Sequence, residues 1–508
     1  MTARHVVSCC YPAMDSTKTK AGGVLGTACL STFVVNANTS AVSILLPSIG
    51  ADLGASVEVL QWAVTGYMLV GAATIVTSGA LGDVFGRRKM FVNGLILFVA
   101  SCVLIAFASS GWMVIAGRVV QGAAGAAILA SGLSLLSAVT SGPAQMRSVS
   151  LWGAAAAGGA AAGPVLGGVL NEATGWQGLF WIDAGIAAAC IPWVLRTVPE
   201  SRDPDRPRSI DFAGTVLIAA ILAPFVFAMT NGSKWGWFSA PTLVCLLITV
   251  LAAFGFVAVE RRIPAPLVDL RLLRNVLLVG STFAILIGAG AIAGLSLLIS
   301  LYFQDPATFG MSSLVAGLAC LPVAAVVVLV APAVTPLAHK LGARPVIVTG
   351  FVLMTAGFGF LAAVRESWSY VLFLPGLLAI AIGLGLSNGP ASSISTAAVS
   401  PEEVGSASGI SNMARYVGGA VLTAVAAGIY ASVTASHVAS GADQAAALAA
   451  GFSRSSIALA VFSAVGILLG LLVARRTPRP QAIHYAAAAA ATAHTVPANP
   501  PEKAVRRT

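Results

Sequence analysis

Long apolar runs separated by short polar turns follow one another along most of the chain. Fourteen runs stand out, and each approaches the roughly 20 residues that an α-helix needs to cross a bilayer. Because a helix satisfies its own backbone hydrogen bonds in lipid, the pattern predicts an all-α membrane protein with 14 transmembrane helices. The predicted spans lie near residues 24–46, 60–80, 90–108, 112–138, 149–171, 178–197, 210–229, 240–258, 276–301, 312–335, 345–363, 370–392, 408–433 and 455–474.

The composition agrees with a chain whose main partner is the lipid bilayer. Hydrophobic residues make up 57% of the 508 residues and charged residues only 9%, against about 25% charged residues in a soluble domain. The net charge of +10 does not indicate a nucleic-acid partner, because the cations are spread over short loops instead of gathering on one domain.

The cations also predict the orientation of the chain. With the N-terminus inside, 23 of the 28 Lys and Arg residues fall in cytoplasmic segments, as the positive-inside rule requires. Three cations lie outside, at Lys234, Arg365 and Arg454, and two lie within spans, at Arg118 and Arg415. We therefore expect a multi-pass membrane protein with both termini cytoplasmic. Arg outnumbers Lys, and Ala and Gly abound, which is typical of a GC-rich bacterial genome and favours a bacterial cell inner membrane.

Sites for other chemistry are not visible in the sequence. The seven cysteines are scattered, the five histidines are isolated, and there is no Gly-Lys-Ser/Thr phosphate cradle. We expect no metal, no cofactor, no enzymatic activity and a monomer. The first apolar run has no cleavage site after it and reads as a signal anchor, and Met14 is an alternative start to Met1.

The turn between the second and third runs, GALGDVFGRRK at residues 79–89, carries the most specific motif. Its cations alone would serve as a positive-inside anchor, but they do not explain the spacing of the other residues. The turn resembles the G-x-L-x-D-x-x-G-R-R loop between spans 2 and 3 of the major facilitator superfamily. The residues that match are Gly79, Leu81, Asp83, Gly86, Arg87 and Arg88.

A second copy of this turn indicates a duplicated architecture. Residues 337–344 echo residues 81–88 at an offset of 256. The resemblance implies two six-helix bundles with two extra helices between them, as in the fourteen-span drug:proton antiporter branch. The predicted parts are a cytoplasmic N-terminal tail at 1–23, an N-terminal bundle at 24–200, two inserted helices at 201–270, a C-terminal bundle at 271–476 and a disordered cytoplasmic tail at 477–508.

The fifth run contains a glycine-rich motif that bears on the direction of transport. Gly159, Gly163 and Gly167 share one helix face, which lets another helix approach closely. Together with Pro164 and Gly168 they resemble the motif found in antiporters of the superfamily, which implies export.

The fourth run contains a cation that an apolar span does not tolerate without a partner or water. Arg118 and Gln121 resemble the R-x-x-Q-G motif that the family links to proton coupling. The alternative is a structural cation that hydrogen-bonds to carbonyl groups.

The polar residues of the first run, Asn36, Asn38 and Ser40, either line a substrate cavity or join helices by hydrogen bonds. The family usually has Asp at position 38, and Asn38 cannot take up a proton near neutral pH. The family usually has Asn where this chain has Asp183. Asp183 is therefore a candidate proton-carrying group, or alternatively a solvated residue near the outer end of its span.

Other residues are candidates for the substrate cavity through their places in the family's span patterns. Gln61, Trp62 and Tyr67 lie in a segment that resembles the branch's span 2. The resemblance places Trp62 near the outer interface, where an interfacial anchor is the alternative, and Tyr67 deeper, where it can face substrate. Gln304 closes the ninth run, and Arg415 is embedded in the thirteenth.

The resemblance implies a secondary active exporter of small amphipathic molecules, such as drugs or antibiotics, that works by alternating access and proton antiport. In that scheme Asp83 interacts with the start of span 13, and Arg87 and Arg88 bind loops of the partner half. Because the embedded charges are mostly Arg, we expect neutral, zwitterionic or anionic substrates in preference to dications. The alternatives are a proton-independent facilitator or importer and a non-transporting membrane sensor.

Overall fold

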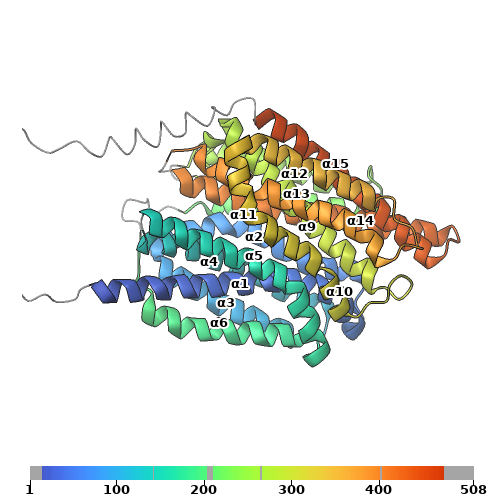
Figure 1. The fold of residues 1–508 in the computed structure, drawn as a ribbon, viewed down its shortest axis with the longest axis horizontal. Helices are drawn as coiled ribbons and strands as arrows, with labels where there is room; N and C mark the ends of the chain where they lie inside the picture. Colours follow the sequence, from blue (N-terminus) through green and yellow to red (C-terminus); the bar gives the residue numbers. More distant parts are fainter. Residues whose placement is uncertain (1–13, 141, 203–209, 264–265, 401–402, 474–508) are drawn as a thin grey trace, which may run out of the picture.

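The computed structural model describes residues 14–140, 142–202, 210–263, 266–400 and 403–473, and these are almost entirely helical (Figure 1). The predicted tail at 477–508 and most of the tail at 1–23 lie outside the described residues. The helices are α1 (Met14–Leu53), α2 (Val57–Phe85), α3 (Arg87–Ala106), α4 (Gly111–Val139), α5 (Gly142–Thr174), α6 (Gln177–Thr197), α7 (Phe212–Trp235), α8 (Ala240–Glu260), the short 3-10 helix η1 (Leu272–Arg274), α9 (Val276–Gln304), α10 (Ser313–Ala319), α11 (Leu321–Leu341), α12 (Ala343–Leu361), α13 (Tyr370–Ala397), α14 (Val404–Ala439) and α15 (Gln444–Val473).

Fourteen segments of the described chain are long and apolar enough to cross a membrane, which confirms the predicted number of spans. Helices α10 and α11 together form the tenth of these spans. The predicted ends are wrong for the last two spans, because α14 continues to Ala439 and α15 begins at Gln444. Polar residues such as His437 and Arg454 therefore belong to helices, although low hydropathy placed them in a loop.

The helices form two bundles, each around its own apolar core. The larger N-terminal core is built mainly from α1 to α6, and a second core is built from α9 to α15. The bundles lie one above the other in Figure 1, with α1 beginning at the same end of the molecule at which α15 ends. We refer to this end as the terminal face and to the other end as the opposite face.

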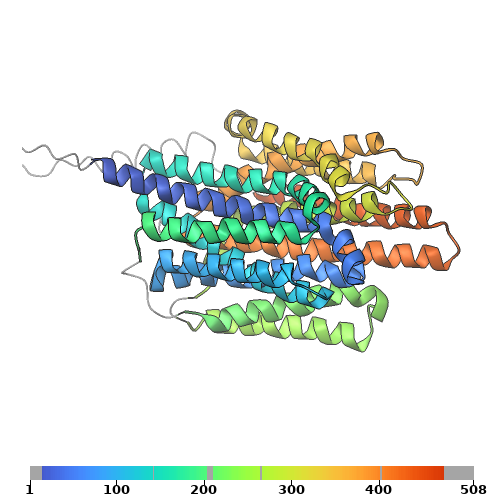
Figure 2. The same ribbon diagram turned by 90° about the horizontal axis from the view of Figure 1, so that it is seen from below.

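The inserted helices α7 and α8 lie on one flank of the molecule, where the two bundles meet. Figure 2 shows this hairpin in green at the lower edge. Residues of α7, including Leu222 and Val226, share an apolar cluster with Leu69 of α2 and Ala420 of α14. Helix α7 thus covers the seam between the halves, whereas most of α8 stays exposed for contact with lipid.

On the other flank the halves are joined close to the opposite face. Ser313 Oγ of α10 lies 3.1 Å from Ser48 Oγ of α1 and accepts a 3.1 Å hydrogen bond from Asn171 of α5. Gln304 Nε2 of α9 donates a 2.9 Å bond to the carbonyl of Ile44. Since each bond links one bundle to the other, α1, α5, α9 and α10 are held together at this level of the molecule.

The two copies of the turn motif have the same backbone form. Gly86 between α2 and α3 has φ +121°, and Gly342 between α11 and α12 has φ +88°. Residues with a Cβ rarely adopt these angles, so glycine is required where each helix pair reverses direction. The duplicated turn seen in the sequence is therefore also a duplicated structure.

Candidate functional site

A fully buried arginine organises a polar network inside the N-terminal bundle. The guanidinium of Arg118 in α4 donates to the Ala63 carbonyl at 3.1 Å, to Asn38 Oδ1 at 2.6 Å and to Gln121 Oε1 at 2.5 Å. Its Cζ lies 4.2 Å from the ring centroid of Tyr67, close enough for a cation–π contact. Its Nη2 has no hydrogen-bond partner among the described residues, so this nitrogen remains a free donor.

The carboxylate nearest to this cation is Asp183 of α6, and the two are joined through an amide. Asn38 Nδ2 donates a 2.7 Å hydrogen bond to Asp183 Oδ2, while Asn38 Oδ1 accepts from Arg118. Asp183 as a whole residue is only 5% exposed, so it is not the solvated residue near the end of its span that the alternative described. The structure thus joins both proton-coupling candidates, Arg118 and Asp183, through Asn38.

The network also touches the C-terminal half. The ring of Tyr67 lies 6.3 Å from the ring of Tyr416 in α14, measured between centroids. Tyr416 packs against Gly71, where a Cβ would lie 2.7 Å from the phenol ring. Gly71 is the midpoint of α2, so this contact between the halves lies midway through the bundle.

The seven substrate-cavity candidates fall into different environments. Asn38, Tyr67 and Gln121 belong to the buried network, and Gln304 lies among the bonds that join the halves. Two are half-buried and bonded to their own helix: Asn36 donates to Thr32 and Ser40 to Asn36. Arg415 is exposed although it lies deep within α14, and it has no described partner.

The glycines of the antiporter motif lie where α5 crosses α1. A Cβ on Gly159 would lie 3.0 Å from Phe33 Cα, and a Cβ on Gly167 would lie 3.0 Å from Ala41 Cβ. Gly163 faces Ser40 and the backbone at Ala37 in the same way. The close approach predicted for this face therefore occurs, and α1 is the helix that uses it.

The last glycine of the motif faces the other half of the molecule. A Cβ on Gly168 would lie 2.6 Å from Leu314 Cα in α10. In return, Gly317 of α10 lies against Pro164, and its Cβ would lie 2.9 Å from the Pro164 carbonyl carbon. The two halves thus meet backbone to backbone here, and Gly317 is a contact that the sequence did not reveal.

The motif turn at 79–89 is held by residues of its own half. Asp83 forms an ion pair with Arg87, with Nη2 and Oδ1 2.9 Å apart. Glu200, just beyond α6, accepts a 3.0 Å bond from the backbone N–H of Arg88, whose guanidinium donates to the Val198 carbonyl at 3.2 Å. In this conformation the described partners of both arginines belong to their own half, so binding to loops of the partner half stays a prediction for another state.

The carboxylate of Glu200 packs against Gly86 and helps to hold the turn in place. A Cβ on Gly86 would lie 2.6 Å from Glu200 Oε1, so the carboxylate occupies the space that a side chain would need. Glu200 was not among the predicted residues, because the segment after span 6 reads only as a charged linker. Of the remaining motif residues, Gly79 and Leu81 lie in the last turns of α2.

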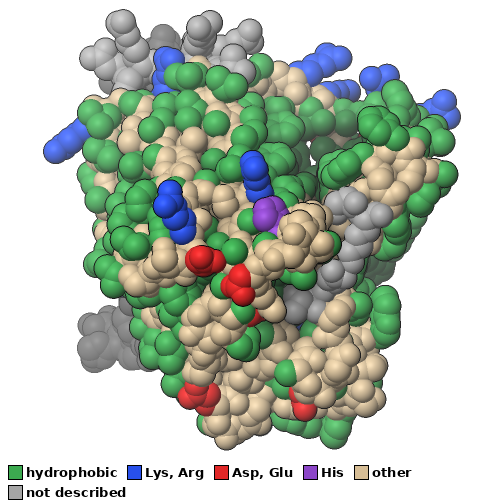
Figure 3. Space-filling model, turned by 90° about the vertical axis from the view of Figure 1, so that its right-hand side faces the viewer, with side chains coloured by type: hydrophobic (Ala, Val, Ile, Leu, Met, Phe, Trp, Pro, Cys, Tyr) green, Lys and Arg blue, Asp and Glu red, His purple; other side chains and the backbone are tan. Residues whose placement is uncertain are grey.

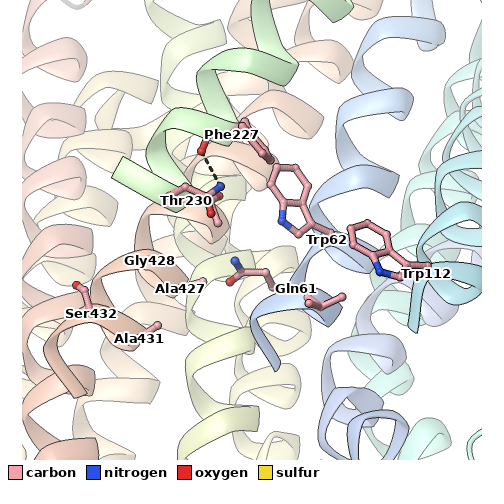
Figure 4. Close-up of a pocket in the computed structure, with 11 residues that line it drawn as sticks. Gln61, Trp62, Trp112, Phe227, Thr230, Ala427, Gly428, Ala431 and Ser432 are labelled. Carbon is pink, nitrogen blue, oxygen red and sulfur yellow. Dashed lines mark hydrogen bonds between the residues drawn. The ribbon is translucent and has the colours of Figure 1, made fainter. Parts of the chain in front are cut away.

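A pocket of about 220 Å³ opens near the opposite face between α2, α4, α7 and α14 (Figure 4). Trp62 lies against Phe227 of α7, with ring centroids 5.4 Å apart, and Trp112 lies across from them. Gln61 and Asn231 supply amide groups to the same lining. Trp62 lies near the start of α2, and the described residues that line this pocket include no charged side chain.

The described residues contain no group of three or more His, Cys, Asp or Glu side chains that could hold a metal ion.

Comparison with known proteins gives a consistent result. The sequence model of the Major Facilitator Superfamily matches residues 28–423. The chain is 32% identical over 468 residues to the cephamycin export protein CmcT of Amycolatopsis lactamdurans, covering 90% of this chain and 94% of that protein. It is 31% identical over 411 residues to the tetracenomycin C resistance and export protein of Streptomyces glaucescens, covering 78% of this chain and 74% of that one.

A multidrug resistance protein, Stp, of Mycobacterium tuberculosis is 30% identical over 404 residues, covering 79% of this chain and 74% of that protein. Among solved structures, the human organic anion transporter MFSD10 superposes with a TM-score of 0.60 at 17% identity, covering 89% of this chain and 99% of that one. This structural likeness supports the fold alone. With its duplicated bundles, its motif turn and 14 spans among the described residues, the chain is a member of the major facilitator superfamily.

Proposed function

We propose that the protein exports small amphipathic molecules, as drug and antibiotic efflux proteins do, and that proton entry drives the export. The relatives described above are resistance and export proteins, which supports the direction of transport. The observation that carries the proton coupling is the buried chain of contacts from Asp183 through Asn38 to Arg118.

The network offers a simple coupling step. When Asp183 is ionised, the amide of Asn38 is oriented between a carboxylate and a guanidinium, and both of its polar atoms are satisfied. Protonation of Asp183 removes the negative charge that fixes this orientation. Arg118 then loses the nearest compensating charge inside an apolar span and must find another partner or water.

Asp183 takes the coupling role that the family assigns to position 38. In this chain the acid and the amide are exchanged between two positions that are hydrogen-bonded to each other. The family's pattern and this chain therefore both place one carboxylate and one amide at positions 38 and 183. Either arrangement supplies a carboxylate that can take up the proton in the coupling step.

The terminal face is cytoplasmic in this proposal. The described residues at that face include the three cations Arg87, Arg88 and Lys89, which begin α3, and most of the other arginines. Figure 3 looks onto the opposite face, where acidic side chains lie beside a few basic ones among apolar and uncharged residues. Its described carboxylates are Asp52, Glu172, Asp305, Glu366 and Asp443, against the cations Arg365 and Arg454. The positive-inside rule supports this orientation.

In that orientation the structure is closed toward the outside, because the bonds around Ser313 join the halves there. Alternating access requires these contacts to separate when the pump opens outward. The motif turn would respond to this movement, with Asp83 interacting with the start of α14 in the outward-open state.

The experiment begins with a gene-deletion strain tested against a panel of antibiotics to find a transported compound. Inside-out vesicles are then given an acidic lumen, and accumulation of that compound is followed with and without an ionophore. We expect accumulation that collapses with the pH gradient. Transport that is indifferent to the gradient would exclude proton antiport and favour a facilitator.

A further inference from the structure

A polar stripe runs along α14 at the seam between the halves. It consists of Ser408, Asn412 and Arg415, which lie on one face of the helix at spacings of three and four residues. None of the three side chains has a described hydrogen-bond or ion-pair partner, and none is fully buried. The stripe therefore presents free donors, including a complete guanidinium fork.

The neighbours of Arg415 on α14 show which way the stripe faces. On one side, Gly418 packs against the backbone of Leu286 in α9, which belongs to the same half. On the other side, Gly419 packs against Met68 in α2 of the N-terminal half. In a view down the helix axis, Arg415 lies between the directions of Gly418 and Gly419. It therefore points between α9 and α2, toward the centre of the molecule.

The depth of this position makes an unpaired cation costly. The next residue, Tyr416, packs against the midpoint of α2 at Gly71. Charges at this depth face a water-filled cavity or a binding partner. The nearby network cannot supply a counter-ion, because the carboxylate of Asp183 is already engaged by Asn38. The network and the stripe together carry two guanidinium groups and one carboxylate.

We propose that Arg415 binds an acidic group of the transported molecule, such as a carboxylate or sulfonate, and that Asn412 and Ser408 add hydrogen bonds to it. The substrate class is then anionic amphipathic compounds. A guanidinium suits this role because its planar fork matches an oxyanion with two parallel hydrogen bonds. This assignment rests on the proposed function, since it names the substrate class of the same transporter.

The placement of Tyr416 next to Arg415 links this site to the proton network. Tyr416 faces Tyr67, whose ring lies beneath the Arg118 guanidinium. A substrate that binds Arg415 shifts the segment of α14 that carries Tyr416. Substrate binding and protonation of Asp183 then both affect the contact between Tyr416 and Tyr67.

The test compares two dyes that share a xanthene frame and carry opposite charge, anionic fluorescein and cationic rhodamine 123. Binding to the full-length protein in lipid nanodiscs is measured by fluorescence anisotropy at pH 7.5, with empty nanodiscs as the blank. We expect the wild type to prefer fluorescein. Arg415→Gln should weaken fluorescein binding by about tenfold or more, as expected for the loss of a charge-assisted bidentate contact, and leave rhodamine 123 binding unchanged.

Arg415→Lys is the matched variant, because it keeps the charge and loses the fork. It should bind fluorescein with an affinity between those of the wild type and Arg415→Gln, and unchanged rhodamine 123 binding shows that both variants are folded. Equal fluorescein affinity in wild type and Arg415→Gln, or a wild-type preference for rhodamine 123, would overturn the assignment. Because binding needs no proton gradient, a failure of proton antiport would leave this result standing, and the two proposals can fail separately.

Discussion

Asn38 and Asp183 are 145 residues apart in the sequence and are joined by a 2.7 Å hydrogen bond in the interior of the N-terminal bundle. The bond places an amide between the carboxylate of α6 and the guanidinium of α4. A direct contact between the two charges would be harder to separate, whereas the bridging amide can turn when the acid takes up a proton. This relationship is the centre of the proposed coupling step.

Replacement of Arg118 should damage the fold as well as transport. Arg118→Leu removes the donor to Asn38 and Gln121 and leaves Asp183 buried without a nearby cation. Breaking a buried charge pair from one side costs about 3–5 kcal/mol, so we expect a clear fall in the thermal unfolding midpoint of the purified protein. Arg365→Gln, at an exposed position, is the control and should unfold as the wild type does. An unchanged midpoint in Arg118→Leu would contradict the network.

The crossing of α1 and α5 should tolerate no side chain at Gly159. A Cβ there would lie 3.0 Å from Phe33 Cα, so Gly159→Ala must push the helices apart and should cost about 1–3 kcal/mol. Gly153→Ala in the same helix is the matched control, because a Cβ there would have no heavy atom within 4 Å. Thermal unfolding of the two variants in detergent separates the packing effect from the gain in helix propensity that both share. Equal stability of the pair would show that α1 does not approach α5 as described.

A disulfide across the closed end should stop transport reversibly. The hydroxyl oxygens of Ser48 and Ser313 are 3.1 Å apart, a separation from which small side-chain adjustments bring two sulfur atoms to bonding distance. The Ser48→Cys and Ser313→Cys double variant should cross-link under mild oxidation and lose export, and reduction should restore it. The measurement is dye efflux from cells before and after reductant, with each single variant as a control. Full export by the cross-linked protein would mean that these contacts need not separate.

The number and the order of the spans could be predicted from the sequence because each span carries its own apolar signal. The turn at 79–89 was also predictable, since glycine at position 86 is a local requirement of the backbone. The ends of α14 and α15 were not, because a hairpin that extends past the apolar layer, with residues such as His437, no longer has high hydropathy.

Contacts between helices were the part that the sequence could not supply. Asn38 and Asp183 were each recognised as departures from the family pattern, but nothing local to either span indicates that they touch. The hydrogen bond from the Arg88 backbone to Glu200 and the backbone contact at Gly317 were missed as well, because both join segments that are distant in the sequence. Arg415 was recognised as an embedded cation, and only the packing of its neighbours showed that it faces the seam.

The most direct measurement compares gradient-driven accumulation in inside-out vesicles for three proteins: the wild type, Asp183→Asn, and the exchange variant in which Asp183→Asn is combined with Asn38→Asp. The account predicts that Asp183→Asn loses gradient-driven accumulation by tenfold or more while downhill exchange persists, and that the exchange variant recovers a large part of it, because the same hydrogen-bonded pair again holds one acid and one amide. Wild-type accumulation in Asp183→Asn would contradict the central claim that this carboxylate carries the proton.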